Sequence, residues 1–446
     1  MSDNKDTIFA LASGFAKAGI SVIRISGNDS RETFKLLTGK EVPESHKATL
    51  CKLKNSKGEM LDEAVCIYFQ APNSYTGEDV LELQVHGGRA VVKNLLSELG
   101  KIKGLRLAER GEFTKRAVLN GKMDLTEAEG INDLINAETF WQVRQALKQM
   151  DGELGRLYDT WRNEIIRILA FTEAYIDFPE EEIPSDIETR ISDKIRGLQN
   201  EIKNHLSQDS GQKLREGYNI ALIGAVNAGK SSVLNKLVKK EAAIVSSIAG
   251  TTRDVVEVFM DLAGFPVIFA DTAGLRETAD VVEKEGIRRA LAKAENADLK
   301  IAVFDGSKKT FDDETLKQID EKTLTVINKK DLMTEEDITE IKKFFTEKVI
   351  FISSKDEKDI KFLLDLIEEK VRSELELREA PVMTRQRHKE SLEAALEALT
   401  RAENDTAVDL RAEDLRLAAR NIGKITGQID VEEVLDIVFK EFCIGK

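Results

Sequence analysis

The sequence predicts a multidomain protein of mixed α/β and all-α class, in which an α/β domain interrupts a helical domain. Three observations support this prediction. Short strand patterns alternate with helices up to about residue 119, apolar residues recur at helical spacing on both sides of a central segment, and that segment alternates buried strands with helices. With 446 residues there is room for about three domains. We expect an N-terminal domain at 1–119, a discontinuous helical domain at 120–215 and 378–446, and an inserted domain at 216–377.

Residues 1–119 have the pattern of a compact α+β domain. Apolar runs rich in β-branched residues predict strands at 7–11, 20–25, 48–53, 64–69 and 80–85. The segment 55–58 (NSKG) predicts a hairpin turn between the middle pair of strands. The segment 86–88 (HGG) is expected to open a helix that runs to Leu99.

From Thr126 onward the pattern becomes helical. Thr126 and Glu129 have the spacing of a capping box, which predicts a helix start. Apolar residues then recur at steps of three and four, at Met150, Leu154, Leu157, Trp161, Ile165 and Ile168. This stripe favours the core of an antiparallel helical bundle over a membrane or cofactor face. Further helices are expected near 186–207, 384–402, 406–426 and 430–441.

Composition narrows the classes of function. The chain has 66 basic and 80 acidic residues, so its net charge is 66 − 80 = −14. Such a chain does not bind nucleic acid through its overall charge, and RNA contact requires a local basic patch or a partner. Cys51, Cys66 and Cys443 fit neither metal-ligand nor disulfide-framework spacing, which favours a reducing compartment. No apolar stretch is as long as the roughly 18 residues of a membrane span, and the amino terminus lacks a signal pattern. We therefore expect a cytoplasmic protein that does not associate with membranes.

The inserted domain begins with a phosphate-binding motif. Residues 224–231 (GAVNAGKS) have the spacing GxxxxGK[ST], between an apolar strand pattern at 218–223 and a helical pattern at 231–238. In this motif the backbone N–H groups converge on phosphate oxygens, Lys230 reaches the β- and γ-phosphates, and Ser231 faces Mg²⁺. We expect phosphate contacts from Asn227, Ala228, Gly229, Lys230, Ser231 and Ser232.

Two further motifs predict a magnesium site and a switch. Asp271, in the segment 271–274 (DTAG), ends a strand pattern, where its carboxylate can hold Mg²⁺ through water. Gly274 is expected to place its N–H near the γ-phosphate. Thr252, in the segment 250–254 (GTTRD), can join Mg²⁺ only when the γ-phosphate holds that segment closed.

The fourth motif predicts a guanine pocket. Asn328 and Asp331, in the segment 328–331 (NKKD), follow an apolar strand pattern at 324–327. A carboxylate at Asp331 suits the two N–H donors on the Watson–Crick edge of guanine, and adenine would leave it unpaired at a cost of about 1–3 kcal/mol. The segment 353–355 (SSK) follows the next strand pattern and is expected to complete the pocket. The four motifs in this order predict a GTPase.

The residues alone do not determine which groups orient the attacking water and stabilise the developing charge during hydrolysis. Leu275 stands where many switch GTPases have a glutamine that orients the attacking water. Asn227 either offers an amide oxygen to a monovalent cation, with oxygens around 246–251, or only shapes its loop. No arginine finger is assigned from the sequence, although Arg253 and Arg276 are nearby candidates. Glu277 and Glu283 are either the missing base or solvated acids.

Over essentially its whole length the chain resembles the MnmE/TrmE family of tRNA-modification GTPases. The matching segments are 24–27 (RISG), 74–79 (SYTGED), 111–117 (GEFTKRA), 119–125 (LNGKMDL), 271–277 (DTAGLRE) and 442–446 (FCIGK). The resemblance implies a folate-binding-like N-terminal domain that also forms a homodimer, and a Ras-like P-loop GTPase domain activated by K⁺. It also implies an FAD-dependent partner of the MnmG/GidA type, in a heterotetramer that contacts tRNA mainly through the partner. Together such proteins add a carboxymethylaminomethyl-type group to carbon 5 of the wobble uridine of certain tRNAs.

The resemblance also implies roles for individual residues. Contacts to 5-formyl- or 5,10-methylene-tetrahydrofolate are expected from Arg24, Glu82, Lys122 and Lys446. K⁺ ligands are expected at Asn227, Ser246, Ile248 and Thr251, Mg²⁺ ligands at Ser231 and Thr252, the general acid/base at Glu283, and a nucleophile at Cys443. Together with those already argued from the motifs, the remaining expected GTP contacts are Ser247, Ala249, Gly250, Asp271, Thr272, Ala273, Gly274, Asn328, Lys329, Asp331, Ser353, Ser354 and Lys355.

One segment departs from the family, because 13–19 (SGFAKAG) replaces a proline- and glycine-rich turn. Two other readings of the chain are a ribosome- or RNA-assembly GTPase and a nucleotide-gated scaffold. The first usually carries an RNA-binding module such as a KH fold, whereas the residues after 377 have helical patterns throughout. Binding of reduced folate by the N-terminal domain would distinguish the second.

Overall fold

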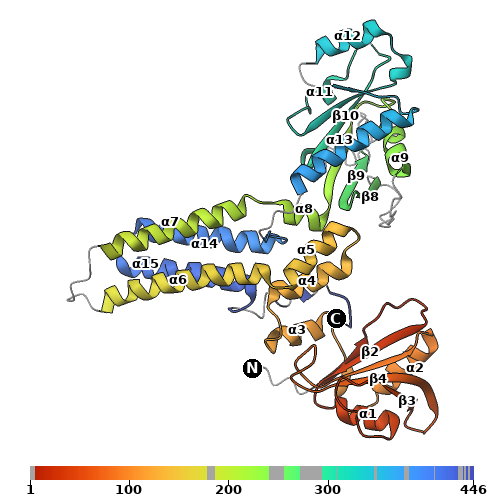
Figure 1. The fold of residues 1–446 in the computed structure, drawn as a ribbon, viewed down its shortest axis with the longest axis vertical. Helices are drawn as coiled ribbons and strands as arrows, with labels where there is room; N and C mark the ends of the chain where they lie inside the picture. Colours follow the sequence, from red (N-terminus) through yellow and green to blue (C-terminus); the bar gives the residue numbers. More distant parts are fainter. Residues whose placement is uncertain are drawn as a thin grey trace, which may run out of the picture. The chain divides into compact units, whose positions relative to one another are not determined.

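The computed structural model describes residues 6–177, 186–240, 256–271, 294–308, 310–345, 349–375, 381–405, 407–429, 435, 438–439 and 442–445. The chain forms two compact units, shown with their helices and strands in Figure 1. The first unit comprises 1–132, 148–200 and 390–446, and the second comprises 133–147 and 201–389. Residues 133–147 therefore belong to the unit that contains the inserted domain, although they are distant from it in sequence.

The first unit contains a six-stranded sheet. Its strands are β1 (Thr7–Leu11), β2 (Ile20–Ser26), β3 (Thr49–Lys54), β4 (Met60–Phe69), β5 (Val80–His86) and β6 (Leu105–Leu107). Their order is β3-β4-β5-β2-β1-β6, and only the pair of β1 and β6 is parallel. Helices α1 (Ser30–Thr38) and α2 (Arg89–Leu99) bury Phe34 and Leu95 in one core with Leu81 and Ile25 of the sheet. The five expected strands are confirmed.

Three elements of this domain were not predicted, namely α1, β6 and α3 (Glu112–Leu119). The strand expected at 64–69 also begins earlier, at Met60. The sequence pattern did not predict the start at Met60 because Asp62 and Glu63 follow it, and acidic residues are uncommon in strands. Asp62 is stabilised within the strand because its carboxylate accepts hydrogen bonds from the backbone and ring nitrogens of His86 on β5.

The helical elements are α4 (Leu125–Asn136), α5 (Phe140–Met150), α6 (Glu153–Asp177), α7 (Asp186–Leu206), α14 (Gln386–Asn404) and α15 (Val408–Thr426). Helices α6 and α15 pack along each other in antiparallel directions, since Asp159 bonds Gln428 and Glu173 bonds Arg416. Trp161, Ile165 and Ile168 are buried, as expected for a bundle core.

One detail of the helical prediction was wrong. The capping box is formed by Asp124 and Glu127, whose side chains each accept the other residue's backbone N–H, so α4 begins before Thr126. Two boxes with the same spacing overlap here, and the earlier one forms. The apolar stripe spans two helices, because a turn at Gly152, with φ +77°, separates Met150 on α5 from the other stripe residues on α6.

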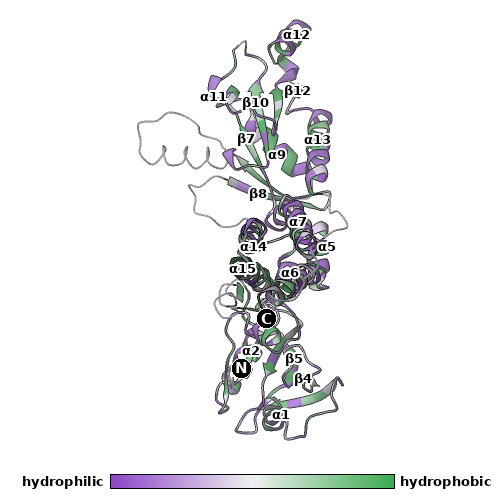
Figure 2. Ribbon diagram, turned by 90° about the vertical axis from the view of Figure 1, so that its left-hand side faces the viewer, coloured by the Kyte–Doolittle hydropathy of each residue, from purple (hydrophilic) through white to green (hydrophobic). Residues whose placement is uncertain are grey.

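The second unit contains a mostly parallel sheet. Its strands are β7 (Tyr218–Ile223), β8 (Val256–Leu262), β9 (Phe265–Asp271), β10 (Leu299–Asp305), β11 (Thr323–Asn328) and β12 (Val349–Phe351). Their order is β12-β11-β10-β7-β9-β8, and only β8 runs antiparallel to its neighbour. Every residue of β10 is buried, and most of this strand is hydrophobic in Figure 2. A strand buried on both faces is typical of a parallel sheet between helices.

The helices of this unit are α8 (Ser210–Glu216), α9 (Lys230–Lys240), α11 (Asp313–Leu316), α12 (Glu335–Phe344), α13 (Glu357–Leu375) and a 3₁₀ turn η1 (Lys330–Leu332). Helices α9 and α13 bury Leu237 and Leu363 against one face of the sheet. Helix α12 buries Ile341 against the other face. Within the described parts of the chain, none of the helices has both the length and the apolar composition of a membrane span.

Candidate functional site

The phosphate-binding loop joins the end of β7 to the start of α9. Gly224 has φ +144°, and a Cβ there would lie 2.3 Å from the carbonyl oxygen of Val303 on β10. Only glycine therefore allows the loop to pass this close to the neighbouring strand. Lys230 is buried, and its Nζ donates to the carbonyl oxygens of Gly224 at 2.6 Å and Ala225 at 3.1 Å. The lysine is thus held inside the curl of its own loop.

Asn328 connects this loop to the base-binding segments. Its side chain is buried at the end of β11, where Nδ2 donates to the carbonyl oxygen of Ala228 at 3.0 Å. Its Oδ1 accepts from the backbone N–H of Ser354 at 3.1 Å. Gly229 permits this approach, since a Cβ there would lie 2.1 Å from Asn328 Nδ2. The position requires one donor and one acceptor on the same side chain, which an amide provides and a carboxylate does not.

Asp331 and the segment 353–355, which are predicted to bind the base, lie in contact with each other. Asp331 Oδ1 accepts from Ser353 Oγ at 2.8 Å, and Oδ2 accepts from Lys355 Nζ at 2.9 Å. These hydrogen bonds, that of Lys355 first, lower the pKa of the Asp331 carboxyl below its usual value. A cavity of about 740 Å³ opens beside these residues. An ionised, accessible carboxylate at this place can accept both N–H groups of a guanine edge.

Two of the predicted magnesium residues, Ser231 and Asp271, lie at the same edge of the sheet. Ser231 is in the first turn of α9, and Asp271 is the last residue of β9, in register with Leu222 of β7. The backbone of Asp271 is thus next to the strand that leads into the phosphate loop. The predicted residues Ser246, Ser247, Ile248, Ala249, Gly250, Thr251, Thr252, Thr272, Ala273, Gly274, Glu283 and Lys446 lie outside the described residues, as do Arg253, Leu275, Arg276 and Glu277.

One residue of this site was missed from the sequence. Asp305 ends β10, and its Oδ2 accepts from Lys329 Nζ at 2.7 Å. It also lines a cavity of about 220 Å³ together with Ala225, Val226 and Ala228 of the phosphate loop. The available signal was its place directly after the apolar run 301–304, because the carboxyl ends of parallel strands meet at the ligand-binding edge.

In the N-terminal domain, Arg24 and Glu82 lie opposite each other on β2 and β5. The guanidinium donates to Glu82 Oε1 from Nε and Nη2, at 2.9 Å each. It also lies over the rings of Tyr75, at 5.0 Å, and Phe113, at 5.7 Å. Burial raises the pKa of Tyr75, whose hydroxyl is within hydrogen-bond distance of Thr114 Oγ1. The pair is therefore enclosed by two aromatic rings while both charged side chains keep some exposure.

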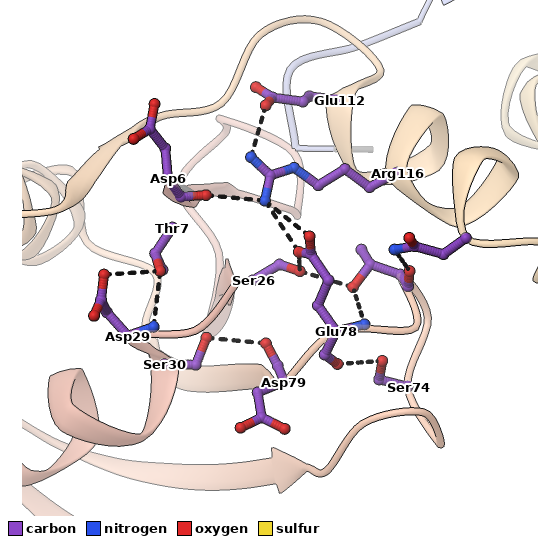
Figure 3. Close-up of polar contacts among 12 residues, drawn as sticks. Asp6, Thr7, Ser26, Asp29, Ser30, Ser74, Glu78, Asp79, Glu112 and Arg116 are labelled. Carbon is purple, nitrogen blue, oxygen red and sulfur yellow. Dashed lines mark hydrogen bonds and ion pairs between the residues drawn. The ribbon is translucent and has the colours of Figure 1, made fainter. Parts of the chain in front are cut away.

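The loop at 70–79 is held by a buried charge network, drawn in Figure 3. Arg116 Nη1 donates to both carboxylate oxygens of Glu78, and Nη2 donates to Glu112 Oε1 at 3.0 Å. Ser26 Oγ also donates to Glu78. Lys122 Nζ donates to the carbonyl oxygen of Pro72, at 2.9 Å. The loop that carries Tyr75 over Arg24 therefore also receives Lys122, so three of the predicted folate contacts gather around it.

The segment 442–445 packs on this same domain. The backbone N–H of Gly111 donates to the carbonyl oxygen of Cys443, and Ile444 forms a β-bridge with Arg110. Gly445 has φ +101°, and a Cβ there would lie 2.1 Å from the carbonyl oxygen of Leu11. This segment thus reaches the end of β1, the strand that pairs with β2 and Arg24. Cys443 is exposed, whereas Cys51 and Cys66 are buried.

The segment that departs from the family, 13–19, packs on the glycines that precede α2. The N–H of Ala18 donates to the carbonyl oxygen of Gly87, and a Cβ on Gly87 would lie 2.4 Å from the Ala18 carbonyl oxygen. Ser13 Oγ accepts from the backbone N–H of Val22 on β2. Phe15, between these anchors, is 73% exposed.

A phosphate loop at the carboxyl edge of a mostly parallel sheet, with a buried asparagine and an ionised aspartate in the base segment, defines a guanine-nucleotide-binding protein of the P-loop class. Family comparison narrows this class. Residues 7–122 match the model described as GTP-binding protein TrmE N-terminus, and residues 125–443 match the model of the MnmE helical domain. The chain belongs to the MnmE family of tRNA modification GTPases.

Curated relatives match the chain over nearly its full length. The protein named tRNA modification GTPase MnmE from Paramagnetospirillum magneticum is 49% identical and covers 99% of this chain and 100% of its own. That of Parvibaculum lavamentivorans is 48% identical with the same coverage. Among solved structures, Aquifex aeolicus Era bound to GDP·AlF₄⁻ is 24% identical and covers 40% of this chain and 66% of its own. Its TM-score of 0.28 is too low to add to the assignment.

Proposed function

We propose that this protein hydrolyses GTP in the service of tRNA modification. The observation that carries the guanine specificity is the arrangement of Asn328 and Asp331. The first ties the phosphate loop to the base segment, and the second is held ionised by Ser353 and Lys355. The role in tRNA modification is supported by the relatives, which carry that function in their names.

Activation by K⁺ is the proposed means of hydrolysis. Asn227 has a left-handed backbone, with φ +67°, at the turn of the phosphate loop. Asparagine tolerates this conformation better than most residues, but glycine adopts it more easily still. The turn by itself therefore does not explain why an asparagine stands here. An amide oxygen at this turn supports a role as a cation ligand beside the phosphates. A monovalent cation there would stabilise the charge that develops during hydrolysis, with Mg²⁺ bound by Ser231 and Thr252.

A tetrahydrofolate derivative is the proposed ligand of the N-terminal domain. Arg24 offers donors and Glu82 offers acceptors side by side, and Tyr75 and Phe113 add aromatic surface. A flat heterocycle with amino and amide edges is the kind of ligand that such a set of groups recognises. The ammonium group of Lys122 is suited to a negatively charged tail of the ligand, and the segment 442–445, which precedes Lys446 in the sequence, packs on this domain.

The partner remains a proposal from the family resemblance. An FAD-dependent MnmG/GidA-type protein would supply the redox step, and the pair would act as a heterotetramer built on a homodimer of this chain. The net charge of −14 supports tRNA contact mainly through that partner. The proposed product is a carboxymethylaminomethyl-type group at carbon 5 of the wobble uridine.

Mass spectrometry of tRNA nucleosides tests this function. A strain that lacks the gene should lose the modified wobble uridine, and the wild-type gene should restore it. A gene encoding Asp331→Asn should not restore it at cellular GTP concentrations. Normal modification in the deletion strain would overturn the proposed role in tRNA, whereas failure of the purified protein to hydrolyse GTP would overturn the proposed activity.

A further inference from the structure

Asp305 is a buried carboxylate at the nucleotide site for which the motifs give no role. Its side chain is 8% exposed, and both of its oxygens have partners. Oδ2 accepts from Lys329 Nζ at 2.7 Å, and Oδ1 accepts from the backbone N–H of Ser307 at 3.1 Å and from its hydroxyl at 2.6 Å. Burial alone would raise the pKa of Asp305, but the hydrogen bonds from Lys329 and Ser307 outweigh it and leave the pKa lowered. The carboxylate is therefore charged when it meets the lysine.

The sheet places this ion pair between the two halves of the nucleotide site. Asp305 is in register with Asn328 on β11, and the N–H of Gly306 donates to the Asn328 carbonyl oxygen at 2.9 Å. On its other side Asp305 shares a cavity with Ala225 and Ala228 of the phosphate loop. The backbone of Lys329 is left-handed, with φ +64°, so its side chain returns to β10 while the main chain continues to Asp331.

The path of Lys329 has a consequence for the ligand. A guanine nucleotide must extend from the phosphate loop at Lys230 to the carboxylate of Asp331. The four methylenes of Lys329 start beside Asp331 and end at Asp305, which borders the phosphate loop. They therefore run along the nucleoside half of that path. A lysine stem fixed at both ends presents a flat apolar surface, whereas a free one loses rotamer entropy on binding.

We propose that Asp305 is a positioning residue for guanine-nucleotide binding, which fixes Lys329 so that the lysine stem supports the nucleoside between Asp331 and the phosphate loop. This inference rests on the guanine-nucleotide binding proposed above. The opposing explanation is that the ion pair only stabilises the end of β10. The two explanations differ in a measurable way, because the first makes the effect of Asp305 depend on Lys329.

A double-mutant cycle tests this dependence. The full chain is prepared as wild type, Asp305→Asn, Lys329→Met and the double variant, and the dissociation constant of a fluorescent GDP (N-methylanthraniloyl-GDP) is measured for each. Asparagine keeps the shape of Asp305 without its charge, and methionine keeps much of the lysine stem without its ammonium. Asp305→Asn should weaken binding about tenfold, as expected for loss of a charge-assisted hydrogen bond that orders a contact group. In the Lys329→Met background the same change should alter the dissociation constant by less than about twofold.

The chain offers a matched control at the opposite edge of the same sheet. Lys300, near the start of β10, bonds Asp320 Oδ2 at 2.7 Å, the same separation as in the pair of Lys329 and Asp305. Asp320→Asn should leave the affinity for GDP within about twofold of wild type. Inorganic pyrophosphate, which engages only the phosphate loop, should compete equally well for wild type and Asp305→Asn.

The outcomes separate the claims. If the wild type does not bind the fluorescent GDP, the proposed function fails. If the wild type binds and Asp305→Asn is unchanged, equals Asp320→Asn, or weakens binding equally in both Lys329 backgrounds, the positioning role is wrong. Should Asp305→Asn unfold, Ser307→Ala removes the hydroxyl hydrogen bond to Asp305 Oδ1, the carboxylate oxygen that does not bond Lys329. That variant should weaken GDP binding about threefold, by the same reasoning, and a wild-type affinity would count against the role.

Discussion

The indole ring of Trp141 is stacked on the phenyl ring of Phe265, with centroids 5.3 Å apart and an interplanar angle of 17°. The backbone N–H of Trp141 also donates to the carbonyl oxygen of Gly264 at 3.1 Å. Gly264 has φ +87°, and a Cβ there would lie 3.1 Å from Trp141 Cδ1. Helix α5 is thereby fixed on the turn between β8 and β9. This contact explains why residues 133–147 group with the nucleotide unit.

Replacing Trp141 with alanine should destabilise the nucleotide unit. The substitution removes the stacked ring over the buried Phe265, and we expect a loss of about 2 kcal/mol in the free energy of unfolding. Urea denaturation of the full chain, followed by circular dichroism, measures this loss. Trp141→Phe keeps an aromatic ring and should recover more than half of the stability. Equal destabilisation by both variants would show that the stacking is not what matters.

Asp331→Asn should lower the affinity for GTP by about 10- to 100-fold, because one or two charge-assisted hydrogen bonds to guanine are lost. Asparagine can donate where aspartate cannot, so the variant should also bind xanthine nucleotides better than the wild type does. Competition of GTP and XTP against a fluorescent nucleotide measures both effects. An unchanged GTP affinity would mean that the base pocket lies elsewhere.

GTP hydrolysis should depend on K⁺ and be weak in Na⁺. At matched ionic strength we expect the hydrolysis rate in K⁺ to exceed that in Na⁺ by at least about tenfold, because K⁺ is proposed to stabilise the charge that develops during hydrolysis. A tenfold difference in rate corresponds to about 1.4 kcal/mol of activation free energy. Phosphate release in KCl and in NaCl is the measurement. Asn227→Ala should abolish the response while GDP binding persists. A full potassium response in this variant would remove Asn227 from the set of ligands.

Glu82→Gln should weaken binding of 5-formyl-tetrahydrofolate about tenfold, because the amide presents a donor where the charged acceptor beside Arg24 is proposed to meet the ligand. Isothermal titration calorimetry measures this change. Glu41 forms an exposed ion pair with Lys35 in the same domain, so Glu41→Gln is the control and should bind as the wild type does. Absence of binding by the wild type would refute the folate proposal itself.

The histidines of the second unit predict a dependence of stability on pH. Burial, with a smaller contribution from the charge of His388, lowers the pKa of His205 to about 4. The folded state therefore favours neutral His205, so its contribution is full above the unfolded pKa near 6.5 and is lost as pH falls toward 4. Between about pH 7 and pH 5 we expect a loss of about 2 kcal/mol in unfolding free energy. His205→Gln should lose less over the same interval. An equal loss would assign the effect to other groups.

Local patterns in the sequence predict much of this fold. Strands β1, β2, β3, β5 and β7 and helices α2, α7, α9 and α15 lie within a few residues of their predicted positions, because apolar periodicity and glycine punctuation act over short stretches. The start of α4 was missed by two residues, since Asp124 and Thr126 both have an acidic residue three positions later. Spacing alone cannot decide which box forms.

Some residues of the candidate sites were predictable from local patterns and others were not. Lys230, Asn328 and Asp331 were predictable, because each belongs to a contiguous motif whose chemistry requires that residue type. The pairs of Asp305 with Lys329, Glu78 with Arg116, and Trp141 with Phe265 were not predictable. Each joins residues at least 24 positions apart, and their meeting depends on sheet order and packing, which no local pattern encodes.

The contact of Gly445 with Leu11 has a consequence for how the protein is made. The two residues are 445 − 11 = 434 positions apart in the sequence, and the residues of the helical and nucleotide domains come between them in chain order. During synthesis the sheet of the N-terminal domain can pair its strands long before residues 442–445 leave the ribosome, since domains generally fold in order of emergence. The surface around Leu11, Arg110 and Gly111 therefore stays uncovered until the rest of the chain has been translated. A ribosome that stops before this point releases an N-terminal domain whose surface beside the end of β1 is still uncovered.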